Sequence, residues 1–187
     1  MFKLILPITV LLVLLGTNSA LARGAAAMGS QSIGLGAILT TPSQDDLDSH
    51  ISTINSTQST SISKFGTGYE FYANYSYRFS GTMFELQFRP SYFMQSTSGN
   101  SYNYSLAAVT FFPLLRVYPL ENQYIHFYMQ AGVGYGRLSG KLNQPSASVD
   151  FAGDAFGALA GLGAQFCADV HCFSVEGNLR YLPIVRS

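Results

Sequence analysis

The chain has 187 residues, no formal net charge and only 11% charged residues, well below the usual share of about 25%. Neutrality and scattered charge argue against a nucleic-acid partner. Hydrophobic residues make up 48% of the chain, yet no segment after residue 22 approaches the roughly 18 consecutive apolar residues of a membrane-spanning helix. A helical membrane protein is therefore excluded.

The N-terminus has the pattern of a secretory signal. Lys3 precedes an apolar stretch from Leu4 to Leu15, and Ala20-Leu21-Ala22 fits the small-x-small cleavage rule. A membrane anchor fits less well, because the apolar run is short and no cluster of charges follows it. We predict a signal peptide over residues 1–22 and one mature domain over residues 23–187.

The first predicted strand covers residues 32–40, and a short helix over residues 44–55 follows it in a long loop. Ser43 is suited to be the N-cap, and the aspartates of the first turn complement the helix dipole. We expect the apolar stripe of this helix to pack on its own sheet. The stripe consists of Leu47, Ile51 and Ile54.

The next two predicted strands, over residues 66–79 and 83–94, alternate almost without a fault. One parity is large and aromatic, and the other carries full charges. A water-soluble sheet buries its apolar face and exposes its charges. The number of aromatic residues favours the reverse arrangement, which is a barrel with lipid outside and polar groups inside.

A tight turn at Gly81-Thr82 would fix the register of these two strands. The expected partners are Tyr77 with Leu86, Tyr75 with Phe88, and Arg78 with Glu85. The aromatic pairs would face lipid. The charged pair would face inward, which predicts a cross-strand ion pair between Arg78 and Glu85.

Four further strands follow with the same alternation. They are predicted over residues 104–117, 124–137, 155–166 and 173–182. Short turns alternate with longer polar segments, which are expected to be loops. These long loops cover residues 41–65, 95–103 and 138–154. Short turns at one end of the sheet and long loops at the other are typical of an outer-membrane barrel.

The two cysteines, Cys167 and Cys172, lie at the last predicted turn. Secretion through an oxidising compartment favours a disulfide between them. Their spacing does not suit a tetrahedral zinc site, and no second ligand pair exists elsewhere. Pairing them fixes the register of the last hairpin. It then places Phe166 opposite Phe173, Gln165 opposite Ser174, Leu159 opposite Arg180, and Gly163 opposite Glu176.

The inward parity of the predicted strands carries a polar set with matched charges. Its members are Glu70, Arg78, Glu85, Gln87, Arg89, His126, Gln130, Glu176 and Arg180. An ion path or a catalytic pocket is one interpretation. A network that fills and neutralises a narrow lumen is favoured, because buried charges need partners. We therefore predict no catalytic, cofactor-binding or metal site. Inward glycines such as Gly132, Gly134 and Gly136 are expected to make room for large side chains.

The signal, the alternating strands, and the short turns opposite long loops resemble the small outer-membrane barrels of the OmpA/OmpX type. The resemblance covers nearly all of residues 23–187 and lies in the pattern rather than in a diagnostic motif. It implies a transmembrane antiparallel up-and-down barrel of eight strands, with an interior filled by side chains. Function would then lie mostly in the loops or at the lipid face.

Seven strands are visible in the sequence, whereas bacterial barrels of one chain have an even number. We expect that the sequence stops before a final loop and an eighth strand. A strand hidden within residues 138–154 is a second explanation. Pairing of the open edges with another subunit is a third.

The predicted function is that of an integral outer-membrane protein of a Gram-negative bacterium. We expect it to be non-enzymatic, with a role in membrane structure, surface interaction or lipid organisation. Its expected partners are membrane lipid and a further copy of itself, with no cofactor and no nucleic acid. An outer-membrane lipid-modifying enzyme of the acyl hydrolase or transferase type is the alternative, as is a narrow channel.

Overall fold

The computed structural model describes residues 29–43, 45–58, 61–99, 102–122, 124–144, 147–168, 171–183 and 185–186. The predicted signal peptide over residues 1–22 lies outside the described residues. The described part is one antiparallel sheet with a single helix, α1 (Asp45–Gln58). The strands are β1 (Ser30–Thr40), β2 (Gly68–Arg78), β3 (Phe84–Gly99), β4 (Tyr102–Glu121), β5 (Ile125–Gln144), β6 (Ala147–Ala168), β7 (His171–Tyr181) and β8 (Val185–Arg186).

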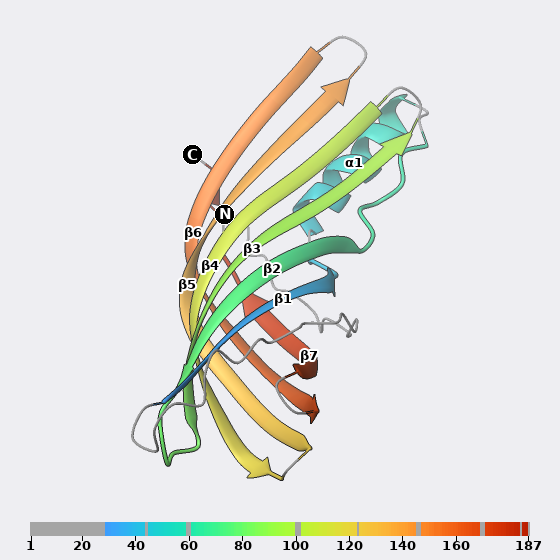
Figure 1. Ribbon diagram of the computed structural model, residues 1–187. Coiled ribbons are helices and arrows are strands. Elements are labelled where there is room, and N and C mark those ends of the chain that lie inside the picture. The colour runs from blue at the N-terminus through green and yellow to red at the C-terminus, as the bar shows by residue number, and fades with distance from the viewer. Residues whose placement is uncertain are drawn as a thin grey trace.

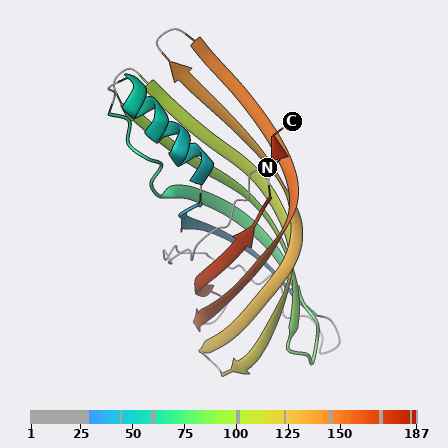
Figure 2. The ribbon, with the colours of Figure 1, turned by 180° about the vertical axis from the view of Figure 1, so that it is seen from behind.

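The sheet runs up and down in sequence order from β1 to β7 and curls through 239° into a half-barrel. Figures 1 and 2 show this curl from opposite sides, with β1 and β7 at the two edges. Seven antiparallel strands and one helix in the first loop were predicted from the sequence, and these are confirmed. The curl gives the sheet a concave and a convex face.

The short strand β8 continues β7 rather than adding a neighbour to it. Both pair with β6, and the pairs Tyr181 with Ala158 and Val185 with Asp154 belong to one unbroken register. Pro183 lies in the interruption between the two strands. Proline has no backbone N–H to donate to a sheet, so one long strand is divided here.

The registers predicted for two hairpins are confirmed. Between β2 and β3, Tyr77 pairs with Leu86 and Tyr75 with Phe88, and Gly81 takes a positive φ of 67° in the turn. Between β6 and β7, all the predicted partners are observed. A disulfide joins Cys167 to Cys172 across the turn.

Two of the predicted loops are wrong. Residues 95–103 and 138–154 were expected to be loops. Instead, β3 and β4 pair as far as Gly99 with Tyr102, and β5 and β6 as far as Gln144 with Ala147. In Figure 1 both hairpins reach well past β1 and β2. The described residues of the segment over 138–154 therefore form no separate strand, because they extend β5 and β6.

The helix α1 packs on the concave face at the end of the sheet where β3 is followed by β4 (Figure 2). Ile51 and Ile54 are buried there against Tyr102 and Tyr104. This confirms packing of the helix on its own sheet, although Gln44 and the side chain of Leu47 lie outside the described part. Ile62 joins the same cluster, and its backbone N–H and C=O both bond to the Asn55 side chain at 2.8 Å.

Inward glycines make room for large side chains at two close approaches. A methyl group at Gly36 would come within 2.3 Å of the Tyr72 ring, and one at Gly163 within 2.3 Å of the Tyr128 ring. Both rings therefore occupy the space that a side chain at the glycine would need. Gly134 is likewise covered by Phe112, so the bulky groups come from β2, β4 and β5.

Candidate functional site

The convex face exposes a wide array of apolar side chains. On β2 and β3, Tyr69, Phe71 and Tyr92 are about half exposed. On β5 and β6 the exposed fraction reaches 70% at Val133 and 79% at Phe156. Contiguous exposed apolar surface of this extent is rare on soluble monomers and marks a surface that contacts a partner protein, a ligand or a membrane.

These side chains form a band with two edges. On β3 the outward apolar residues begin at Phe84 and end at Met94, and on β6 they run from Phe156 to Phe166. The register aligns these runs from β2 to β4 and from β5 to β6, with an offset of four residues between β4 and β5. Each run covers roughly ten residues, which is what a tilted strand needs to cross the hydrocarbon of a membrane.

The concave face behind this band is polar and closely paired. Its centre is Glu176 on β7, which is buried. An Arg89 nitrogen lies 2.5 Å from one of its carboxylate oxygens, and an Arg116 nitrogen lies 3.3 Å from the other. Tyr128 donates a hydrogen bond of 3.0 Å to the same carboxylate, and so does the Asn178 amide. One carboxylate thus joins β3, β4, β5 and β7.

Arg116 extends the network to a second carboxylate. Its guanidinium lies 3.5 Å from Glu85 and donates through Nε to Gln130 at 2.8 Å. Tyr118 donates to the other Glu85 oxygen at 3.0 Å. Glu85 was predicted to pair with Arg78. The two residues are Cα partners, but Glu85 forms its ion pair with Arg116 and Arg78 forms its own with Glu121. The predicted ion pair between Arg78 and Glu85 is therefore wrong.

Arg78 reaches across to β4 and forms two hydrogen bonds with the Glu121 carboxylate, at 2.7 and 2.5 Å. His126 lies beside the same carboxylate at 3.6 Å. This cluster is at the short-turn end of the sheet and is partly exposed. Curvature decides the pairing, because a strongly curled sheet brings alternate strands within reach of long side chains.

Arg180 on β7 pairs with Glu70 on β2 at 2.6 Å. The pair spans the concave face between the edge strand β7 and β2, the neighbour of the other edge strand. Each of four arginines also stacks on an aromatic ring, the shortest distance being 3.7 Å between the Arg89 guanidinium carbon and the Tyr72 ring centre. Such stacking compensates partly for the desolvation of the cations.

The structure brings most of the predicted inward residues into direct contact. Glu70, Glu85, Arg89, Glu176 and Arg180 are at least largely buried, whereas Arg78 and His126 lie at the rim. Sequence reasoning missed Arg116, Tyr118 and Tyr128. Arg116 has the same parity as Leu114, whose strand lacked a clear outward face in the sequence.

The three histidines are not brought together among the described residues. His50 and His171 are exposed and far apart in the fold, and His126 contacts Glu121. Within the same residues, no cluster of three His, Cys, Asp or Glu side chains could hold a metal ion. No helix in the described part is long and apolar enough to span a membrane.

Comparison of the chain with protein-family models, with curated proteins and with solved structures found no match.

Proposed function

We propose that this protein is an integral outer-membrane β-barrel protein without enzymatic activity, which organises lipid or surface contacts. The observation that carries the proposal is the sidedness of the sheet. The band of exposed aromatic and aliphatic side chains lies on the convex face of the sheet, and the buried Arg–Glu pairs lie on its concave face. In water this arrangement would expose the apolar surface and desolvate the charges, both unfavourable.

The paired interior supports a structural role over conduction. The buried arginines Arg89, Arg116 and Arg180 each have a carboxylate partner. Rings and amides occupy the space between these pairs. A narrow barrel is filled by its own side chains, and large stable conductance steps in a planar bilayer would contradict this part of the proposal.

We further propose that one more strand between β7 and β1 completes a barrel of eight. Six steps share 239° of curl, about 40° per step, and one added strand would divide the remaining 121° into two steps of about 60°. Two copies joined edge to edge would require a much flatter sheet. That would separate Arg180 from Glu70, so the ion pair supports closure by a single strand.

Membrane fractionation tests the proposed location. The full chain is produced in a Gram-negative host, and the inner and outer membranes are separated. The protein should be in the outer membrane and should resist extraction by alkaline carbonate. Recovery as a soluble periplasmic protein would contradict the proposal.

The oligomeric state in a mild detergent tests the source of the closing strand. A folded monomer is expected if a continuation of the same chain supplies the strand. A stable oligomer would instead indicate that a subunit provides it, and unfolding on extraction would argue against closure by either route.

A further inference from the structure

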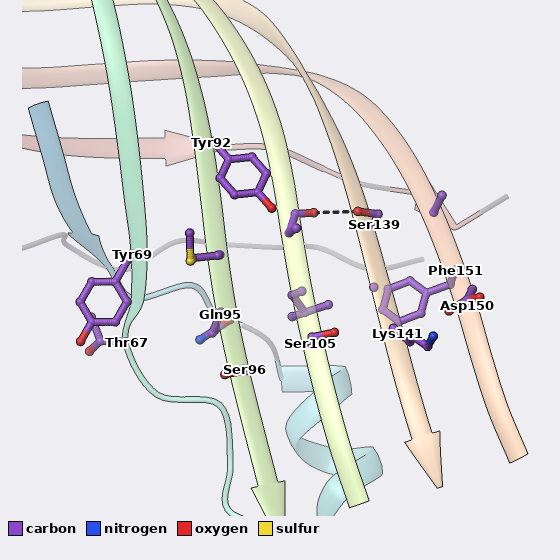
Figure 3. A pocket seen from close by; sticks show the side chains of 15 residues that line it. Thr67, Tyr69, Tyr92, Gln95, Ser96, Ser105, Ser139, Lys141, Asp150 and Phe151 are labelled. Carbon is purple, nitrogen blue, oxygen red and sulfur yellow. Dashed lines mark hydrogen bonds between the residues drawn. The ribbon is translucent and has the colours of Figure 1, made fainter. Parts of the chain in front are cut away.

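A groove of about 890 Å³ crosses the convex face from β2 to β6, near the far edge of the apolar band. Figure 3 shows Tyr69 and Tyr92 at one end and Lys141 and Asp150 at the other. The helix α1 contacts the opposite face of the sheet. The groove is therefore separate from the concave network and open to whatever surrounds the barrel.

Small residues form the floor of this groove. They are Ser105 and Ala107 on β4, Ser139 on β5 and Ala152 on β6. The Ser139 hydroxyl donates to the Ala107 carbonyl at 3.4 Å, which is the bond drawn in Figure 3. Larger side chains rise on both sides, so the hollow results from the sequence of side-chain sizes across five strands.

The two ends of the groove lie at different levels of the proposed membrane. The register places Met94 opposite Ala107, and Ala107 opposite Ser139. Met94 is the last apolar residue of the band on β3, whereas on β5 the band ends earlier, at Tyr135. One end of the groove is therefore level with acyl chains. The end at Lys141 lies beyond them, at the level of headgroups.

The headgroup end carries one charge of each sign. Lys141 and Asp150 are Cα partners on β5 and β6, and both side chains are exposed. Among the described residues, neither forms an ion pair. The hydroxyls of Thr67, Ser96 and Ser105 line the same groove. A purely anionic headgroup would be repelled by Asp150, whereas one with a phosphate and an ammonium group would satisfy both charges.

We propose that this groove binds a membrane lipid with a zwitterionic phosphate–ammonium headgroup, an inference that rests on the proposed outer-membrane function. Lys141 and the hydroxyl of Ser105, its Cα partner on β4, contact the phosphate, and Asp150 contacts the ammonium group. Tyr69, Tyr92 and Met94 hold the upper part of an acyl chain. Tyrosine rings are suited to this level, because they combine an apolar body with a polar end.

Native mass spectrometry of the folded full chain tests the proposal. The protein, in mild detergent, receives equal amounts of phosphatidylethanolamine and phosphatidylglycerol with identical acyl chains. We expect the former to be retained about three- to fivefold more, as a solvent-exposed charge contact allows. D150N should abolish this preference, and K141Q should lower retention of both lipids. R137Q, on the same strand and face but outside the groove, should change neither.

Three results would overturn the proposal. They are equal retention of the two lipids by the unmodified chain, an effect of R137Q as large as that of K141Q, and displacement of the lipid by an equal concentration of soluble phosphoethanolamine, which lacks acyl chains. Insertion into lipid vesicles, measured in parallel, separates the two hypotheses. Failure to insert contradicts the proposed function itself, whereas insertion without lipid discrimination contradicts only the groove.

Discussion

The exposed apolar band and the far ends of the two long hairpins use the same strands in opposite ways. We call those ends the arms; they consist of residues 95–99 with 102–107 and residues 137–144 with 147–154. In the band of β4, Leu115 faces outward and Arg116 inward. In the arm of the same strand, Asn103 faces outward and Tyr104 is buried inward.

The strand does not change parity between these two regions. What changes is the chemistry of each parity, which the proposed change from lipid to water outside the sheet would explain. Beside lipid, the inner face can be polar if every charge is paired. Beyond the proposed lipid layer, the outer face would meet water, and the inner face packs α1 in an apolar core. The position of this reversal along each strand marks the proposed membrane boundary.

The strongest test of the band's interior is the removal of its central carboxylate. E176A leaves Arg89 and Arg116 buried without their shared partner, which should lower the free energy of unfolding by about 3–5 kcal/mol. Urea unfolding of the protein in lipid vesicles measures this. A loss below about 1 kcal/mol would mean that water or lipid headgroups reach these arginines.

The strongest test of the arms is the loss of an apolar contact under the helix. I51A should lower the free energy of unfolding by about 3 kcal/mol, because the fully buried side chain would leave a cavity. H50A, at an exposed position of the same helix, should change it by less than about 0.5 kcal/mol. Equal effects of the two variants would contradict an apolar core in the arms.

Substitutions on the outward face of β4 can compare the band with an arm in one paired experiment. L115R places a charge in the middle of the proposed hydrocarbon layer and should cost about 2–3 kcal/mol. N103R places the same charge on the same strand and face in an arm, and should cost almost nothing. Unfolding in vesicles measures both variants, and a similar cost for the two would remove the basis for the boundary.

The smallest expected effect is at the rim. E121A breaks the contact with Arg78, whose side chain is 22% exposed, and should cost no more than about 1 kcal/mol. Added salt should weaken this contribution further, whereas it should leave that of Glu176 almost unchanged. A salt-independent effect at Glu121 would place the rim inside the low-dielectric region.

The same comparison explains which parts could be predicted from the sequence. The band was predicted with its register, because aromatic residues of one parity give a strong period-two signal, as in Tyr75 and Tyr77. The arms were taken for loops, because Ser139, Gly140 and Gly153 weaken the alternation and the apolar parity changes sides. Arg116 and its partners were missed for a different reason. Which long side chains meet inside depends on the curl of the whole sheet, and no local pattern encodes it.

The Arg180–Glu70 pair also bears on how the molecule acquires its shape. The hairpins join residues close together in sequence, whereas this pair joins residues 110 positions apart. Contacts between such distant residues form slowly, since a long stretch of chain must first be ordered. The hairpins can therefore assemble one after another, and the curl is completed when the two ends of the sheet are drawn together across the interior.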